Sequence, residues 1–71
     1  MLWECPVQMD EQSKDVLRVV AYEAGVPQLE KRHFYLSSHG AWEPGRTRGL
    51  TRMDLELILG RIGEISAAFR R

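Results

Sequence analysis

Arginines and aromatic residues gather in the segment from Gly40 to Asp54, GAWEPGRTRGLTRMD, and in the residues just before it. The side chains that could contact a partner there are Tyr35, Trp42, Arg46, Arg48 and Arg52. A guanidinium can bond a phosphate or a carboxylate in two places, and an aromatic ring can stack on a base or fill an apolar pocket. Glycine and proline in the same segment favour a loop, so we expect a contact surface there.

The expected occupant of this surface is a larger protein, which would make the chain a small regulatory or adaptor module. Tryptophan and arginine are enriched at the energetic centres of protein–protein interfaces. The alternative occupant is a nucleic acid, bound through Arg46, Arg48 and Arg52 with the helix that follows. The formal net charge of zero speaks against this alternative, because nucleic-acid-binding domains usually carry an excess of basic residues. A third interpretation is that the segment only connects two elements.

No set of residues predicts catalysis. The one cysteine, Cys5, alternates with Trp3 and Val7 on the apolar side of a predicted strand, where a cysteine is usually a small buried hydrophobe. The run Ser37–His39 places two hydroxyls beside an imidazole, but no nucleophile signature surrounds it. We therefore expect a protein that is not an enzyme.

Metal and cofactor sites are also not predicted. The residues that could ligate a metal are Cys5, His33, His39 and Glu43, and their spacing matches no zinc pattern. The segment GRTRG lacks both the spacing and the lysine of a phosphate-binding loop. We expect neither a metal nor a cofactor.

Chain length and cysteine content determine the expected oligomeric state. A chain of 71 residues forms one domain, residues 1–71, with a small core that usually needs a disulfide, a metal or a partner subunit. A single cysteine cannot form an internal disulfide and is typical of a reducing compartment, so we expect a cytoplasmic protein. No apolar run is long enough to span a membrane. A homodimer or higher oligomer is the expected state.

The first third of the chain predicts a strand and then a helix. Residues 2–9 alternate, with Trp3, Cys5, Val7 and Met9 on one face, and Pro6 favours a sheet edge or a bulge. Residues 10–27 carry apolar side chains at helical spacing. Their predicted cap residue is Asp10 or Ser13, and the stripe is Val16, Val20 and Ala24, with Leu17 and Ala21 beside it. Gly25 in the left-handed conformation and Pro27 would end this helix.

The remainder predicts one or two strands and a second helix. The run RHFYLSS favours a strand with Phe34 and Leu36 on one face and His33 and Tyr35 on the other. A short return strand is weakly indicated near residues 41–43 or 46–48. Residues 50–71 predict a helix in which Thr51 and Asp54 form a capping box. Its expected apolar face is Leu50, Met53, Leu57, Ile58, Ile62, Ile65 and Phe69.

These elements predict a small α+β domain of β-α-β(-β)-α order, a two-layer sandwich with two helices on a short sheet. Its topology is that of a ferredoxin-like fold without the last strand, and no family motif accompanies it. Gly60, Gly63 and Ala67 form a smooth strip on the second helix. Each interior glycine costs a helix roughly 1 kcal/mol relative to alanine, so a closely packed neighbour is expected, either within the chain or across a homodimer.

Overall fold

The fold is a four-stranded antiparallel sheet followed by two short helices. A computed structural model describes residues 2–22 and 25–70. The sheet order is β1-β2-β3-β4, so every strand pairs with its neighbour in the sequence. The elements are β1 (Trp3–Met9), β2 (Ser13–Ala21), β3 (Pro27–Leu36), β4 (Trp42–Thr47), α1 (Arg52–Gly60) and α2 (Ile62–Phe69).

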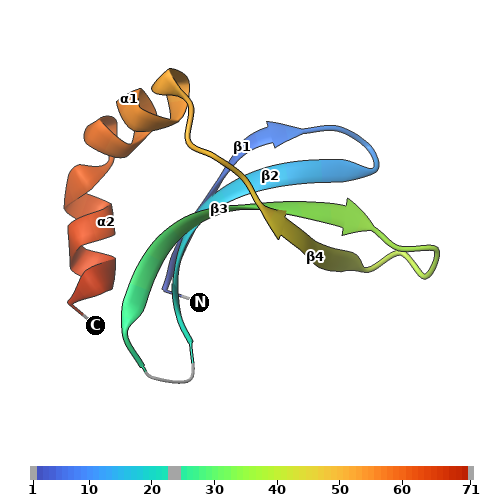
Figure 1. Ribbon diagram of the computed structural model, residues 1–71, viewed down its shortest axis with the longest axis horizontal. Coiled ribbons are helices and arrows are strands. Elements are labelled where there is room, and N and C mark those ends of the chain that lie inside the picture. Colours follow the sequence, from blue (N-terminus) through green and yellow to red (C-terminus); the bar gives the residue numbers. More distant parts are fainter. Residues whose placement is uncertain (1, 23–24, 71) are drawn as a thin grey trace.

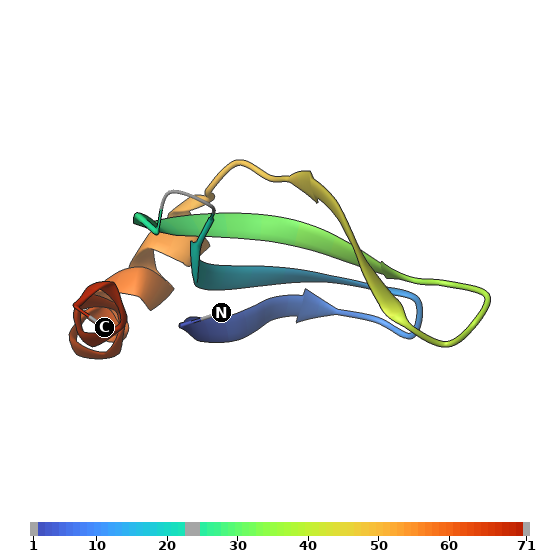
Figure 2. The same ribbon diagram turned by 90° about the horizontal axis from the view of Figure 1, so that it is seen from below.

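The helices lie beside one end of the sheet and leave the other end uncovered. Figure 1 shows α1 and α2 next to the end that holds the start of β1. The turns that join β1 to β2 and β3 to β4 project away from the helices. Figure 2, which views the strands nearly edge-on, shows the same separation of helices and turns. Among the described residues, no helix combines the length and apolarity that a membrane span needs.

The predicted β-α-β(-β)-α order is wrong, because residues 10–27 do not form a helix. Ser13–Ala21 form β2 and Pro27 begins β3, and the observed order is β-β-β-β-α-α. Val16, Leu17, Val19 and Val20 are all buried, so β2 has apolar residues on both faces. Such a run matches helical spacing by accident, while its valines favour a strand. The domain is still a small α+β fold, but its sheet has no ferredoxin-like crossover.

The residues predicted to begin and end this helix, Asp10 and Gly25, lie instead in the connections before and after β2. The Asp10 side chain accepts hydrogen bonds from the backbone N–H of Gln12 at 2.8 Å and of Ser13 at 2.7 Å, as an N-cap would, but the chain then enters β2. These bonds lower the pKa of Asp10. Gly25 does adopt the left-handed conformation, with φ 73°, in the connection before β3. The predicted helix position Ala24 lies outside the described residues.

The predicted first strand is confirmed, and Pro6 acts as expected. β1 is an edge strand whose register with β2 shifts between Pro6 and Gln8. The shift pairs Met9 with Lys14, which places Met9 on the opposite face from Trp3 and Cys5. The strand around Phe34 is also confirmed, although β3 already begins at Pro27. The return strand β4, Trp42–Thr47, overlaps both of the weakly indicated ranges, 41–43 and 46–48.

The C-terminal helical segment is confirmed but broken. Thr51 and Asp54 form the predicted capping box at the start of α1. The helix breaks at Arg61, whose ψ of 19° is not helical, and α2 then begins at Ile62. Of the predicted apolar face, Ile58 and Ile65 are buried, whereas Leu50, Met53, Ile62 and Phe69 are exposed.

The two faces of the sheet differ in what covers them. Leu17 and Val19 point toward the helices and form the core with Ile58, Ile65 and Ala68. We call this the covered face. Alternation along β2 places Lys14, Val16 and Arg18 on the opposite side, the open face, where no helix packs among the described elements. Val16 is nevertheless fully buried.

Candidate nucleic-acid interface

The open face brings cations and aromatic rings together across three strands. In the β2–β3 register, Lys14 lies opposite Phe34, Val16 opposite Arg32, and Arg18 opposite Glu30. Trp42 of β4 joins this face because it pairs with Leu36, two residues beyond Phe34. Two half-buried rings, Phe34 and Trp42, thus lie among three basic side chains on this face: Lys14, Arg18 and Arg32. We call this group the platform.

Direct contacts link these cations to the rings. The Lys14 ammonium lies 4.7 Å from the centre of the Trp42 ring and 5.7 Å from that of Phe34. The Arg18 guanidinium lies 5.1 Å from the Phe34 ring centre. Cations at these distances are attracted to the negative face of the ring. Lys14 has no carboxylate partner among the described residues, so its charge is available to a ligand.

A carboxylate lies within this cationic surface. Glu30 accepts hydrogen bonds through Oε2 from Nε of Arg18 at 2.9 Å and from Nε of Arg32 at 2.7 Å, and through Oε1 from the Tyr22 hydroxyl. Burial raises the pKa of Glu30, but hydrogen bonds from Arg32, Tyr22 and Arg18 outweigh it and bring the pKa to about 2. Glu30 in turn raises the pKa of Arg32. The cluster therefore holds two positive charges and one negative charge.

The structure does not bring all five sequence-predicted contact residues together. Trp42 lies on the open face, as described. Tyr35 pairs with Ser13 and Glu43 on the other side of the sheet, where its side chain is 44% exposed and its hydroxyl donates to Glu43 at 3.4 Å. Arg52 is the first residue of α1, outside the sheet, and pairs with Glu56 at 3.8 Å.

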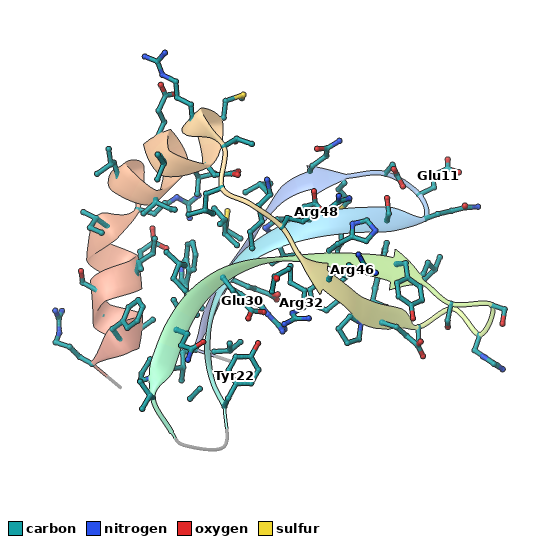
Figure 3. The ribbon with its side chains drawn as sticks, viewed as in Figure 1. Glu11, Tyr22, Glu30, Arg32, Arg46 and Arg48 are labelled. Carbon is teal, nitrogen blue, oxygen red and sulfur yellow. The ribbon has the colours of Figure 1, made fainter. Side chains whose placement is uncertain are left out.

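Arg46 and Arg48 line the end of the sheet on the Tyr35 side. Arg48 lies 3.5 Å from Asp15 and 3.4 Å from the ring of His33, whose Nδ1 is 2.8 Å from the same aspartate. Arg46 has no ion-pair partner among the described residues, and it borders a cavity of about 350 Å³ with His33 and Arg48. Figure 3 shows both arginines on β4 and the segment just after it. Asp15 and His33 alternate with Lys14 and Phe34, so Arg48 lies on the other face of the sheet from the platform.

Outside the sheet, the predicted oligomer strip points away from the domain. A side chain built at Gly60 or Gly63 would meet no atom within 4 Å apart from the near helix backbone, and Ala67 is exposed. Large apolar residues beside this strip are also exposed: Leu55 51%, Leu59 71% and Ile62 51%. The described chain thus supplies no packing partner for the two glycines.

The residues considered for chemistry are scattered. Cys5 is half-buried, and its Sγ lies 3.7 Å from the Pro6 carbonyl oxygen. His39 lies in the β3–β4 turn, away from His33 on the strand. Within residues 2–22 and 25–70, no three His, Cys, Asp or Glu side chains are grouped as a metal site would require. The predictions of no enzyme activity and no cofactor stay predictions.

Lys14 and Arg18 are candidate contact residues that the sequence pattern does not predict. They were assigned to a helix, in which they would occupy solvated positions. Had SKDVLRVVA been interpreted as a strand, alternation would have placed both on one face, opposite Leu17 and Val19. The valines of this segment were the available signal.

Comparisons with protein families, with curated proteins and with solved structures gave no match. The function is therefore inferred from the side chains alone.

Proposed function

We propose that this protein binds single-stranded nucleic acid across the open face of its sheet, and that it does so as a homodimer. The observation that carries the proposal is the cation–aromatic platform of Lys14, Arg18, Phe34 and Trp42 on a face without a helix. Proteins that bind single strands combine a positive surface that follows the backbone with aromatic rings on which bases stack.

The platform favours a single strand over a duplex. Its rings are half-buried within the sheet. A base would stack on Trp42 in place of the Lys14 side chain that lies over the ring, which requires a base that is already unstacked. Reading a duplex usually requires a helix or ribbon that enters a groove. Here the helix cations Arg52 and Arg61 are paired with Glu56 and Glu64. The neutral net charge is compatible with this proposal, because binding depends on the local charge. The open face carries Lys14, Arg18 and Arg32 against two carboxylates, Glu30 and Glu4, of which Glu4 pairs with Arg18 in the register.

The exposed helix surface supports a homodimer. Leu55, Leu59 and Ile62 expose large apolar areas beside Gly60 and Gly63, which would let a second backbone approach closely. A chain with so small a buried core gains stability from such a partner. In the dimer, two platforms would be presented to one strand, and linked contacts of this kind raise the overall affinity.

Nucleic-acid binding is tested by fluorescence anisotropy with a labelled oligothymidylate and a duplex of equal length. We expect binding of the single strand that weakens with salt. Lys14→Gln should lower the slope of log affinity against log salt by about 0.7, the value for one phosphate contact on a single strand. Trp42→Ala should cost about 1–3 kcal/mol if one base stacks on the ring.

Arg52→Gln is the matched control, since it removes a cation from α1 rather than from the sheet, and affinity should remain unchanged. If the wild-type protein ignores both oligonucleotides while Trp42 is needed to capture a protein partner, the adaptor function is correct and our proposal is not.

The dimer is tested by sedimentation equilibrium. The wild-type chain should sediment as a dimer at tens of micromolar, and Leu59→Glu, which places a charge on the apolar surface, should sediment as a folded monomer. A wild-type monomer at these concentrations would remove the dimer from the proposal but leave the platform in place.

A further inference from the structure

The environment of Glu30 on the open face is that of a bound anion. Three donors converge on its carboxylate: Nε of Arg18, Nε of Arg32 and the hydroxyl of Tyr22. Figure 3 shows Glu30, Arg32 and Tyr22 close together on the side of β3 away from the helices. Paired arginine donors with a hydroxyl are the groups that proteins use to bind phosphate.

The two arginines differ in what they can still offer to a ligand. Arg32 is committed to the fold, since its Nη1 donates to the Gly45 carbonyl oxygen at 2.7 Å and its Nη2 contacts the Tyr22 hydroxyl at 3.3 Å. Arg18 uses Nε for Glu30, whereas its two Nη groups have no hydrogen-bond partner among the described residues. Its guanidinium is held in place by the Phe34 ring on one side. The two Nη groups of Arg18 therefore remain available to a ligand.

The Glu30 carboxylate opposes any second anion at this fork. An oxygen bound to the Nη groups of Arg18 would lie on the same guanidinium as the Glu30 carboxylate, and like charges at such distances repel. The side chain of Glu30 is only 11% exposed, so water screens this repulsion poorly. Its low pKa keeps the charge present throughout the neutral range.

We propose that Arg18 binds phosphate on the open face through its two Nη groups, and that Glu30, held beside it by Arg32 and Tyr22, is a competitor that weakens the binding of nucleic-acid phosphate there. This inference rests on the proposed function. It assigns Arg18 as the residue that contacts phosphate and Arg32 as the residue that fixes the site to β4. Glu30 would thus lower the affinity of the open face for nucleic-acid phosphate.

The test replaces Glu30 with glutamine, which keeps the size and an acceptor oxygen but removes the charge. Glu30→Gln should bind the oligothymidylate roughly tenfold more tightly than wild type at low salt. The salt slope should become steeper by about 0.7, because one further phosphate gains a contact. The matched control is Glu11→Gln, which changes the net charge equally in the exposed β1–β2 turn, where Glu11 has no partner among the described residues. Its affinity should stay within twofold of wild type.

Further variants separate competition from folding. Glu30→Thr removes the carboxylate with a residue that favours strands, and it should show the same gain if Glu30→Gln does not fold. Adding Arg18→Gln to Glu30→Gln should abolish the gain.

If the wild-type protein binds the oligothymidylate but neither Glu30 variant binds it more tightly, the competitor role alone is overturned. If the Glu30 variants bind it more weakly, the competitor role is also overturned and Glu30 is a residue that positions Arg18. A gain that persists without Arg18 would also overturn it. Absence of binding by the wild-type protein would overturn the proposed function and this inference together.

Discussion

Two carboxylates that accept hydrogen bonds from basic side chains, the buried Asp54 and the half-buried Glu30, lie in different surroundings. Asp54 belongs to the first turn of α1, and its Oδ2 accepts hydrogen bonds from Lys31 Nζ at 2.7 Å and from the Thr51 backbone N–H at 2.8 Å. Burial raises the pKa of Asp54, but the hydrogen bonds from Lys31 and Thr51 outweigh it and lower the pKa. Glu30 lies on the open face and is shared by two arginines.

The two sites differ in net charge. Lys31 and Asp54 form a neutral pair with side chains only 10% and 6% exposed, so nothing is left over for a ligand. The Glu30 cluster keeps one uncompensated positive charge on a surface that no described helix covers. A neutral ion pair such as Lys31 and Asp54 can join two elements but does not attract an external anion. A cluster with an excess positive charge, such as that around Glu30, does attract one.

The largest expected effect comes from removing Asp54. Asp54→Ala would leave the Lys31 ammonium buried without a partner and would also destroy the capping box. Removing one partner of a buried pair typically lowers the free energy of unfolding by about 3–5 kcal/mol. Urea denaturation followed by circular dichroism measures this loss. Thr51→Ala is the control, since it removes only the side-chain cap and should cost about 1 kcal/mol. Equal losses in both variants would contradict the structural role of the ion pair.

A smaller effect is expected when the pH is lowered. Both carboxylates have pKa values below those of the free side chains, so each contributes stability that is fully present above the unfolded pKa and is lost as pH falls through the folded pKa. For Glu30 the window runs from about 4.5 down to about 2. The free energy of unfolding should therefore decline below pH 4.5. In Glu30→Gln this decline should be shallower, and identical pH profiles for the two proteins would show that the cluster adds no stability.

The smallest effect is expected for the exposed pair on α1. Arg52 and Glu56 are 92% and 69% exposed, and such pairs contribute at most about 1 kcal/mol. Arg52→Ala should leave the denaturation midpoint nearly unchanged. A large loss of stability would mean that α1 packs against another molecule in solution, which would bring Arg52 into the dimer interface.

The sequence was informative where local chemistry decides the structure. The capping box of Thr51 and Asp54, the irregularity next to Pro6 and the left-handed Gly25 all depend on residues close together in the chain, and all three are present. The assignment of residues 10–27 failed because burial on both faces is a tertiary property. Val16 and Leu17 are both fully buried, so hydrophobic periodicity could not distinguish a central strand from a helix.

The candidate site was partly predictable for the same reason. Trp42 stood out as an aromatic residue within a turn-rich segment, and it does belong to the open face. Lys14 and Arg18 depend on the strand assignment that failed, and their convergence on Phe34 requires the β2–β3 register. The Glu30 cluster joins residues from β2, β3 and the turn after β2, a combination that no sequence motif encodes.

The simple strand order has a consequence for how the chain folds. Because each strand pairs with the one before it, three successive hairpins can build the sheet with short loop closures, and chains dominated by such local contacts fold quickly. The helices come last in the sequence, yet α2 packs against β1, where Trp3 donates to Glu64 at 3.4 Å. Ile58 and Ile65 can bury themselves only on a sheet that already presents Leu17 and Val19. We therefore expect the two ends of the chain to meet in the final step of folding, when the helices dock onto a preformed sheet.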